Sequence, residues 1–328
     1  MTTLTTLLRK YPLPKGWSRP ELFEDRLELN GITLELRGLH SQNESGQIVT
    51  GSAVERDLVP LNRAFFELVE RVSIVEAEAS VKQKYPALDI TESPLGVRSH
   101  THVFPENPEP ELWRLSRSNG VAIHTDWKRA CEAASFELIE RDRLLRSWFG
   151  EFSPKPWSGS TMPRALEKYY DFEYYLFHSP AGERDVVAAG VFGFPKEAGL
   201  GRVYGSAARA TAPEAFEAAS RECLQGLGFM WKEALPKTAP AFSPTSDFHQ
   251  ESFLLESGLV RIRHWLQGGH TLLRGIPAKN QFEFFDLTPP TLRGKLCVVK
   301  AVDSTIIPLI FGKAPGRELD NRWLHPFA

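Results

Sequence analysis

The chain has 328 residues, of which 42% are hydrophobic and 24% are charged, and its formal net charge is −2. This composition is typical of a globular protein, and the near-neutral charge argues against nucleic acids and anionic membranes as partners. No stretch approaches the about 20 consecutive apolar residues that a membrane-spanning helix needs.

The cysteines and the N-terminus predict a cytoplasmic protein. Cys131, Cys223 and Cys297 lie far apart and form no CxxC pair, which indicates reduced thiols rather than a disulfide framework. The N-terminal MTTLTTLLRK has no basic leader before its short apolar run, so we expect no signal peptide.

The first third of the chain predicts a hairpin and a helix. EDRLELNGITLELRGL, residues 24–39, has the alternation and central Asn-Gly of a hairpin, and residues 41–52 read as a polar loop. A helix should follow from about Asp57 to Ala79. We predict an N-terminal extension over 1–44 and one catalytic domain over 45–328.

The remaining elements alternate between helices and strands, which favours an α/β fold. Residues 84–113 are rich in proline and predict an ordered loop or lid. The other expected elements are, in order, a helix from the small-residue turn at Ser118 to Phe149, a helical segment over 162–171, strands over 172–178 and 185–194, a turn and long helix over 202–231, a Pro/Ser loop over 235–250, a helix over 251–269, and two β segments with an extended tail over 294–328.

A long-period repeat runs through these elements. SNGVAIHTDWKRACEAASFELIE, from Ser118, aligns with YGSAARATAPEAFEAASRECLQ, from Tyr204, and TGSAVERDLVPLNRAFFELVE, from Thr50, matches when one residue is dropped. In each copy a turn of small residues precedes a helix with two polar side chains three residues apart, on one helix face. The pairs are Glu67 and Glu70, Glu137 and Glu140, and Glu222 and Gln225.

These faces suit metal-bridged phosphate binding. Carboxylate and amide oxygens are hard ligands for Mg²⁺, which bridges them to nucleotide phosphates. The small residues at the helix entries could bring backbone N–H groups close to an anion, and Arg141 could add positive charge. The sequence contains neither GxxxxGK(S/T) nor a GxGxxG that opens a helix.

The alternative is that each acidic pair lies on a solvent-exposed helix face. A single ExxE favours that interpretation, because charged side chains are mostly exposed. Three copies in register, each after the same small-residue turn, favour a shared site instead.

The SNG…ELIERD stretch, the earlier ELVER, the later ExxQ and the closing VVKAVDSTIIPLIFG…HPF resemble the YcaO family from about residue 45 to the C-terminus. The resemblance implies a YcaO-like fold of repeated turn-helix units packed on mixed β-sheets around an ATP and Mg²⁺ site. It also implies ATP-dependent activation of a peptide amide. A neighbouring Cys, Ser or Thr attacks the amide carbon, and loss of the phosphorylated oxygen leaves a thiazoline or oxazoline.

The resemblance assigns roles residue by residue. It implies metal ligands at Glu67, Glu70, Glu137, Glu140 and Glu222, and nucleotide-binding residues at Gly51, Ser52, Ser118, Asn119, Arg141 and Gln225. Two basic residues of the family pattern have no match: the lysine near Gly51 is missing, and the arginine after Gln225 is Gly228.

The C-terminal tail departs from the family pattern as well. Azoline-forming members usually end in PxPxP, whereas the matching positions here are Leu324, Pro326 and Ala328. The resemblance implies that His325, Pro326 and the terminal carboxylate of Ala328 take part in catalysis. The two lost prolines predict a less preorganised tail, because proline restricts φ.

Other candidate sites are weaker. His100 and His102 with His124 could suggest a metal site, but two loop histidines rarely suffice. Cys131 and Cys223 read as buried structural thiols. The tryptophans at 127, 148 and 157 are more typical of core packing than of a nucleic-acid platform, and no GxSxG elbow marks a hydrolase.

We therefore expect an ATP-dependent cyclodehydratase of a ribosomal peptide pathway. Two alternatives stay open: thioamide or amidine formation, and a non-catalytic nucleotide-binding scaffold. The implied partners are a precursor peptide and a leader-peptide-binding protein. A flavin dehydrogenase of the same pathway and a homodimer are open possibilities.

Overall fold

The structure is a computed structural model that describes residues 3–80, 84–177, 186–231, 233–269, 280–313 and 321–327. The chain divides into two compact units. Unit 1 comprises Met1–Pro105, Gly120–Glu137 and Gln281–Asp303, and unit 2 comprises Glu106–Asn119, Leu138–Asn280 and Ser304–Ala328. Both mix helices with sheets, so the predicted α/β class is confirmed.

The first sheet of unit 1 is antiparallel and has the order β1-β2-β3. The predicted hairpin is confirmed: Asn30 and Gly31 have φ angles of 45° and 85° and connect β1 (Glu21–Leu29) to β2 (Ile32–Gln42). The polar loop expected over 41–52 is wrong, because β3 (Ile48–Arg56) pairs with β2 across this stretch. The division predicted after residue 44 falls in the turn between these two strands and stays a prediction.

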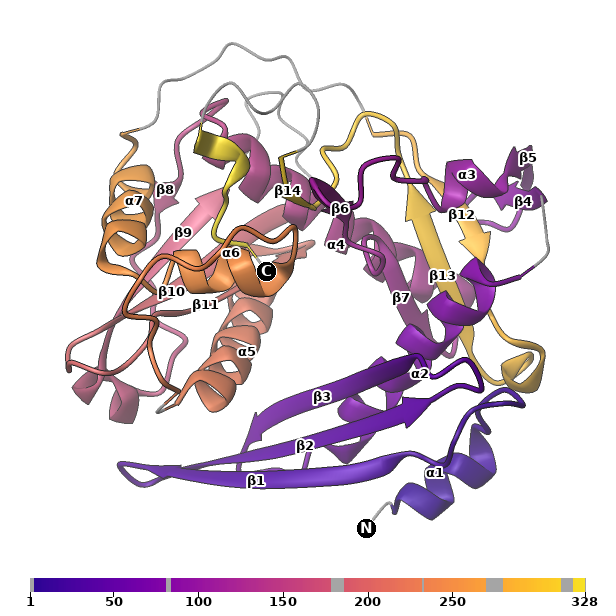
Figure 1. Ribbon diagram of the computed structural model, residues 1–328, viewed down its shortest axis with the longest axis horizontal. Helices are drawn as coiled ribbons and strands as arrows, with labels where there is room; N and C mark the ends of the chain where they lie inside the picture. Colours follow the sequence, from indigo (N-terminus) through magenta and orange to yellow (C-terminus); the bar gives the residue numbers. More distant parts are fainter. Residues whose placement is uncertain are drawn as a thin grey trace. The chain divides into compact units, whose positions relative to one another are not determined.

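Helix α2 (Leu61–Glu78) packs on strands β2 and β3 (Figure 1). Its apolar residues recur at helical spacing, and Phe65, Leu68, Val69 and Val72 are fully buried. Helix α1 (Leu4–Lys10) adds Leu7 to the same core.

The second sheet of unit 1 has the order β5-β4-β12-β13-β7. Its strands are β4 (Lys84–Leu88), β5 (Pro94–Ser99), β7 (Val121–His124), β12 (Glu283–Asp286) and β13 (Cys297–Val302). The loop or lid predicted over 84–113 is therefore wrong in its first part. Strands β4 and β5 and the short helix α3 (His100–Val103) lie there, and the turn at residues 89–93 joins the two strands. The 3-10 turn η2 (Pro290–Leu292) precedes β13.

Unit 2 is built on a sheet with the order β11-β10-β9-β8. The strands are β8 (Lys155–Pro156), β9 (Tyr170–Phe177), β10 (Val187–Pro195) and β11 (Val203–Arg209). Helix α5 (Ala212–Met230) packs on β10 and β11 (Figure 1).

The remaining elements of unit 2 are short. The helical segment predicted over 162–171 is the 3-10 turn η1 (Arg164–Lys168). The helix predicted over 251–269 is divided into α6 (Ser246–Ser252) and α7 (Glu256–Leu266). Strand β14 (Ile310–Gly312) pairs with β6 (Trp113–Leu115), and η3 (Asn321–Trp323) precedes the tail.

Helix α4 (Trp127–Trp148) is the predicted motif helix and continues from unit 1 into unit 2. The Asp126 carboxylate accepts a hydrogen bond from the Arg129 N–H at 3.0 Å and so caps its first turn. Ala130, Cys131 and Ala134 are fully buried. Among the described residues, no helix is long and apolar enough to cross a membrane.

Candidate functional site

Direct contact between strand β3 and helix α2 of unit 1 positions Glu67. A Cβ atom at Gly51 would lie 2.2 Å from the Leu68 nitrogen and 2.3 Å from the Ala64 carbonyl oxygen, so only glycine allows this approach. The close packing brings the Ser52 N–H to the Glu67 carboxylate at 2.8 Å. Gly51 and Ser52 thus position a glutamate of the neighbouring helix.

Arg71 partly balances the charge of Glu67. Its guanidinium donates to the Glu67 carboxylate one helical turn away and to the Thr50 carbonyl oxygen at 2.7 Å. Burial nevertheless raises the pKa of Glu67, with Arg71 and the Ser52 N–H acting in the opposite direction. Glu70 follows on the same helix and is partly buried.

Strand β11 and helix α5 repeat this arrangement in unit 2. A Cβ atom at Gly205 would lie 2.1 Å from the Ala219 carbonyl oxygen and 2.2 Å from the Cys223 nitrogen. The Ser206 N–H points to the Glu222 carboxylate at 3.4 Å. The repeat read from the sequence is therefore a structural repeat of a glycine-serine strand on a glutamate helix.

The small-residue segments at Gly51 and Gly205 are strands rather than turns, which corrects the sequence interpretation. The N–H groups of Ser52 and Ser206 point to glutamates, so they are not the helix-entry anion donors that we expected. The physical reason is that the small side chains serve close strand–helix packing.

Ser206 also connects two helices of unit 2. Its hydroxyl donates to Glu140 at 2.6 Å, while its backbone N–H points to Glu222. Burial raises the pKa of Glu140, and Ser206, Arg141 and Arg209 act against that rise. An added positive charge would stabilise the ionised form of this carboxylate.

Arg141 is held by the turn before β7. Its guanidinium donates to the Asn119 side-chain oxygen at 3.0 Å, and Asn119 is buried. Ser118 is partly buried beside Ser116, with 3.4 Å between their hydroxyl oxygens. Three of the predicted nucleotide-binding residues therefore lie close together in unit 2.

The other predicted ligands lie on the same helices. Glu137 is partly buried on α4, Gln225 is partly buried on α5, and Glu222 is exposed. Within the described ranges, no three or more His, Cys, Asp or Glu side chains gather as a metal cluster. Mg²⁺ often takes only one or two carboxylates and completes its shell with phosphates and water. The buried carboxylate of Glu67 in unit 1 and that of Glu140 in unit 2 each offer oxygen donors of the kind that Mg²⁺ prefers.

The tail is fixed by His249, a residue that the sequence analysis missed. The Gly312 N–H donates to His249 Nε2 at 3.0 Å, so Nδ1 carries the hydrogen and donates to the His325 carbonyl oxygen at 3.0 Å. The His325 Nε2 donates in turn to the Ile310 carbonyl oxygen at 2.8 Å, and its residue is 2% exposed.

The next two residues are also buried within unit 2. The Arg202 guanidinium donates to the Pro326 carbonyl oxygen at 3.0 Å, and Phe327 packs against Trp265 with 5.6 Å between ring centroids. These contacts hold the tail up to Phe327, and the expectation of a less preorganised tail stays a prediction. Ala328 lies outside the described residues.

Ser206, Arg209, His249 and Arg202 were not singled out from the sequence. Ser206 had a signal, because Gly51-Ser52-Ala53 recurs as Gly205-Ser206-Ala207. His249 and Arg202 act through backbone carbonyls far along the chain, and no local pattern reveals such partners. His102, from the weak histidine candidate, contacts Glu283 at 3.0 Å.

Solved structures of low sequence identity share the fold. The YcaO protein from Methanopyrus kandleri, bound with AMPPCP and Mg²⁺, is 19% identical with a TM-score of 0.59, over 86% of this chain and 84% of that one. A chain of the E. coli microcin synthetase McbBCD complex is 12% identical in sequence with a TM-score of 0.55, and the match covers 88% of each chain. A heterocyclase in complex with substrate and cofactor is 16% identical in sequence with a TM-score of 0.53, and the match covers 92% of this chain and 52% of that one.

No curated protein matches the sequence. A sequence model of the YcaO family, described as a cyclodehydratase that binds ATP and Mg²⁺, matches residues 94–300. The match includes the glutamate helices α4 and α5 and the strands that pack on α5. The chain therefore belongs to the YcaO family of ATP-dependent, Mg²⁺-binding enzymes.

Proposed function

We propose that the chain catalyses ATP-dependent cyclodehydration of Cys, Ser or Thr in a ribosomally made precursor peptide. The observation that carries the proposal is the Ser206 bridge, which holds Glu140 of α4 and Glu222 of α5 in one oxygen-rich cluster. Together with the family's ATP and Mg²⁺ binding, this cluster supports phosphoryl transfer.

The side-chain sulfur or oxygen of the substrate loses its proton and adds to the carbon of the preceding amide, and the former amide oxygen takes the γ-phosphoryl group of ATP with release of ADP. The carbon–oxygen bond then breaks with release of phosphate. The nitrogen loses its proton as the C=N bond of the azoline forms.

The proposed ligand set follows the family resemblance, with Glu67, Glu70, Glu137, Glu140 and Glu222 for Mg²⁺ and Ser118, Asn119, Arg141 and Gln225 for the nucleotide. Gly51 and Ser52, which the resemblance also assigns to the nucleotide, act instead by positioning Glu67. Bound Mg²⁺ would neutralise charge that develops on the phosphates. Arg141, oriented by Asn119, supplies a fixed guanidinium for phosphate oxygens. Arg209 adds positive charge near Glu140 and offsets the missing arginine at Gly228.

The tail completes the proposal. Ala328 would act through its terminal carboxylate as the base that removes the amide proton, with His325 and Pro326 as the residues that position it. The support is the anchoring of His325 by His249 and of Pro326 by Arg202. A tail held in this way could direct its end without the two missing prolines.

Thioamide or amidine formation is the second candidate. It is supported by the loss of the tail prolines at Leu324 and Ala328, because the resemblance links PxPxP to azoline formation. A non-catalytic nucleotide-binding scaffold would also accommodate Gly228. The proposed partners are the precursor peptide and a leader-peptide-binding protein, with a flavin dehydrogenase and a second copy of the chain as further candidates.

The test incubates the protein with ATP, Mg²⁺, the precursor peptide and the neighbour-encoded partner, and measures the peptide mass. We expect the loss of one water for each modified residue. An exchange of oxygen for sulfur or nitrogen would favour the thioamide or amidine reaction, and an unchanged mass with intact ATP would contradict catalysis.

The site test uses Glu137→Gln and Glu140→Gln, which keep side-chain size and remove one charge each. We expect each to lower ATP turnover at least about 100-fold. The matched control is Glu132→Gln on the same helix, where the side chain is 43% exposed and paired with Lys128. Full turnover in both site variants would refute the metal assignment.

A further inference from the structure

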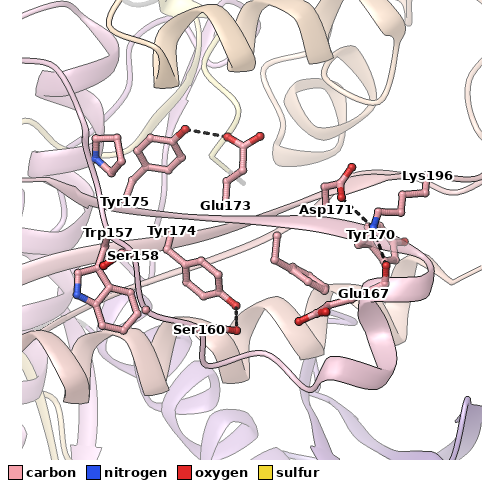
Figure 2. A pocket seen from close by; sticks show the side chains of 13 residues that line it. Trp157, Ser158, Ser160, Glu167, Tyr170, Asp171, Glu173, Tyr174, Tyr175 and Lys196 are labelled. Atoms are coloured by element: carbon pink, nitrogen blue, oxygen red, sulfur yellow. Dashed lines mark hydrogen bonds and ion pairs between the residues drawn. The ribbon is translucent and has the colours of Figure 1, made fainter.

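A cavity of about 530 Å³ lies beside strand β9 in unit 2, and none of the site glutamates lines it (Figure 2). It is an open hollow bordered by β9 and by the segment that runs from Trp157 through η1, and Figure 2 shows Trp157, Ser160 and Tyr174 on its lower side. Its volume is in the range of peptide and small-molecule sites. The proposed phosphoryl-transfer chemistry uses none of its lining residues.

One wall of the cavity is an open sheet edge. Strand β8 pairs only with Tyr175 and Leu176 of β9, whereas β10 pairs with the whole strand. Within the described residues, the first half of β9 therefore has a strand partner on one side only. Such an edge accepts an added strand.

The backbone groups on this edge can be assigned by alternation. The Trp157 N–H donates to the Tyr174 carbonyl oxygen at 2.9 Å, so the backbone groups of Tyr174 face away from β10. In an antiparallel strand every second residue faces the same side. The N–H and C=O of Phe172 therefore face the cavity edge beyond the end of β8.

The cavity walls are rigid and aromatic. The Trp157 ring stacks on Phe216 with 4.0 Å between centroids, so its position is fixed. The Tyr174 hydroxyl is within 3.2 Å of the Ser160 hydroxyl and accepts from the Met162 N–H at 3.1 Å. Fixed aromatic faces bind a chain at low entropic cost and attract cations.

The charge of the lining is acidic. Its carboxylates are Glu167, Asp171 and Glu173. Asp171 pairs with Lys196, the single lysine of the lining, at 2.9 Å, and Glu173 pairs with Arg263 at 3.5 Å, which leaves the charge of Glu167. The Glu167 carboxylate makes no ion pair or hydrogen bond with the described residues, and Figure 2 shows it on the same side of β9 as Tyr174. A basic side chain complements this surface.

We infer that the cavity, here called the β9 slot, binds an extended segment of the peptide substrate that carries a lysine or arginine. The segment pairs with the backbone of Phe172 as an added strand, and its basic side chain lies against Tyr174 and Glu167. The inference rests on the proposed function for the identity of the substrate, and it gives that substrate a second point of attachment.

The experiment measures fluorescence anisotropy of labelled peptides with the full chain and no nucleotide. The probe is Ser-Val-Thr-Lys-Thr-Val-Ser, compared with the same peptide containing Glu in place of Lys, and with the Lys peptide N-methylated on alternate amides. We expect saturable binding of the Lys peptide. The Glu peptide should bind at least about 10-fold more weakly, because its carboxylate meets the acidic lining. N-methylation removes strand pairing and should weaken binding by about 10-fold.

The protein variant is Glu167→Gln. Its affinity for the Lys peptide should be about 3- to 5-fold lower, as expected when a partly exposed ion pair is lost. The matched control is Glu233→Gln, an exposed glutamate outside the slot, which should bind as the unmodified chain does. The peptide variants leave the protein unchanged, so their result stands even if a protein variant folds poorly.

Three results would overturn the β9 slot: no saturable binding, equal binding of all three peptides, or an edge already occupied by a second copy of the chain that the peptide does not displace. The proposed function is judged separately. A chain that binds ATP and modifies its precursor but ignores these peptides keeps the function and loses the slot. A chain that binds the peptides but never consumes ATP keeps the slot and loses the function.

Discussion

The β3–α2 pair of unit 1 and the β11–α5 pair of unit 2 pack in the same way and use the same residue types. In each, glycine brings a strand against helix backbone, and the following serine directs its N–H to a glutamate. The close approach fixes where the carboxylate lies, because the strand cannot shift without losing the contact. The repeat is therefore a device for positioning acid groups.

The two pairs differ in how the charge is balanced. Glu67 has Arg71 one turn later on its own helix, whereas the residue at the same spacing from Glu222 is Gly226. The Ser206 hydroxyl instead serves Glu140 of a second helix. Unit 1 thus balances its glutamate internally, and unit 2 gathers two glutamates around one serine, where a divalent cation would be stabilised.

The largest expected effect comes from breaking the strand–helix contact. Gly51→Ala and Gly205→Ala each place a methyl group at 2.1–2.2 Å from helix backbone atoms, so we expect a loss of about 4 kcal/mol in the free energy of unfolding. Denaturant unfolding measures it. In the control Gly226→Ala, the nearest atom lies at 3.4 Å, and better helix propensity should stabilise by up to about 1 kcal/mol. Unfolding of Gly205→Ala at the unmodified midpoint would contradict the repeat.

Acid should affect unit 2 through its tail. Burial lowers the pKa of His249 to about 4 from its usual 6.5, so below pH 6.5 the unfolded chain binds a proton that the folded chain does not. Stability is then complete above pH 6.5 and falls by about 3 kcal/mol as the pH drops to 4. Hydrogen exchange of α5 amides against α2 amides over this range measures it.

His249→Phe removes the titrating ring nitrogen and serves as the test variant. It should be less stable at neutral pH, because the Gly312 N–H and the His325 carbonyl lose their partner, but its acid dependence should be flatter. His40, whose side chain is 41% exposed, provides the control substitution His40→Asn. An unchanged acid limb in His249→Phe would show that another group causes it.

The two serines separate the roles of hydroxyl and backbone. Ser206→Ala removes the hydroxyl that donates to Glu140, and we expect MgATP affinity to fall about 10-fold, the size of one charged hydrogen bond. Ser52→Ala keeps the N–H that contacts Glu67 and should bind MgATP as before. Titration calorimetry compares them. Equal affinities in the two variants would mean that the Ser206 bridge does not shape the nucleotide site.

The smallest effect concerns Arg71. Arg71→Ala removes a partly exposed ion pair with Glu67, so we expect a loss of about 0.5–1 kcal/mol at low salt. Salt should remove most of this difference, because screening weakens exposed pairs. Unfolding at low and high salt measures it, with Arg221→Ala on α5 as a matched i,i+4 control. A salt-independent loss would indicate packing rather than charge.

The sequence predicted the helices well because their signal is local. The apolar spacing around Phe65 and Leu68 and the three pairs of polar side chains located α2, α4 and α5. It misread the Gly-Ser stretches as turns, because the contact that makes Gly51 and Gly205 necessary comes from a helix further along the chain. Small residues show little alternation of apolar and polar side chains, so the sequence pattern of a strand is weak there.

The site could be predicted only in part. The acidic pairs and the tail were apparent as motifs, and Asn119 and Arg141 are in contact as their shared assignment suggested. Strands β4 and β5 were not predicted, because their sequences contain proline and glycine, which are uncommon in strands. Ser206 needed the alignment of two glycine-serine copies. The anchoring of the tail by His249 depends on backbone atoms of Gly312 and His325. Backbone contacts of this kind cannot be predicted from the pattern of side chains.

The central claim is that ATP activates the oxygen of a substrate amide. The most direct measurement labels that amide oxygen with the heavy isotope in a synthetic precursor, supplies ATP, Mg²⁺ and the partner protein, and analyses the released phosphate by mass spectrometry. We predict one heavy oxygen in phosphate for each azoline formed, and no label transfer with Glu140→Gln. Azoline formation with unlabelled phosphate, or ATP consumption with no label leaving the peptide, would contradict the account.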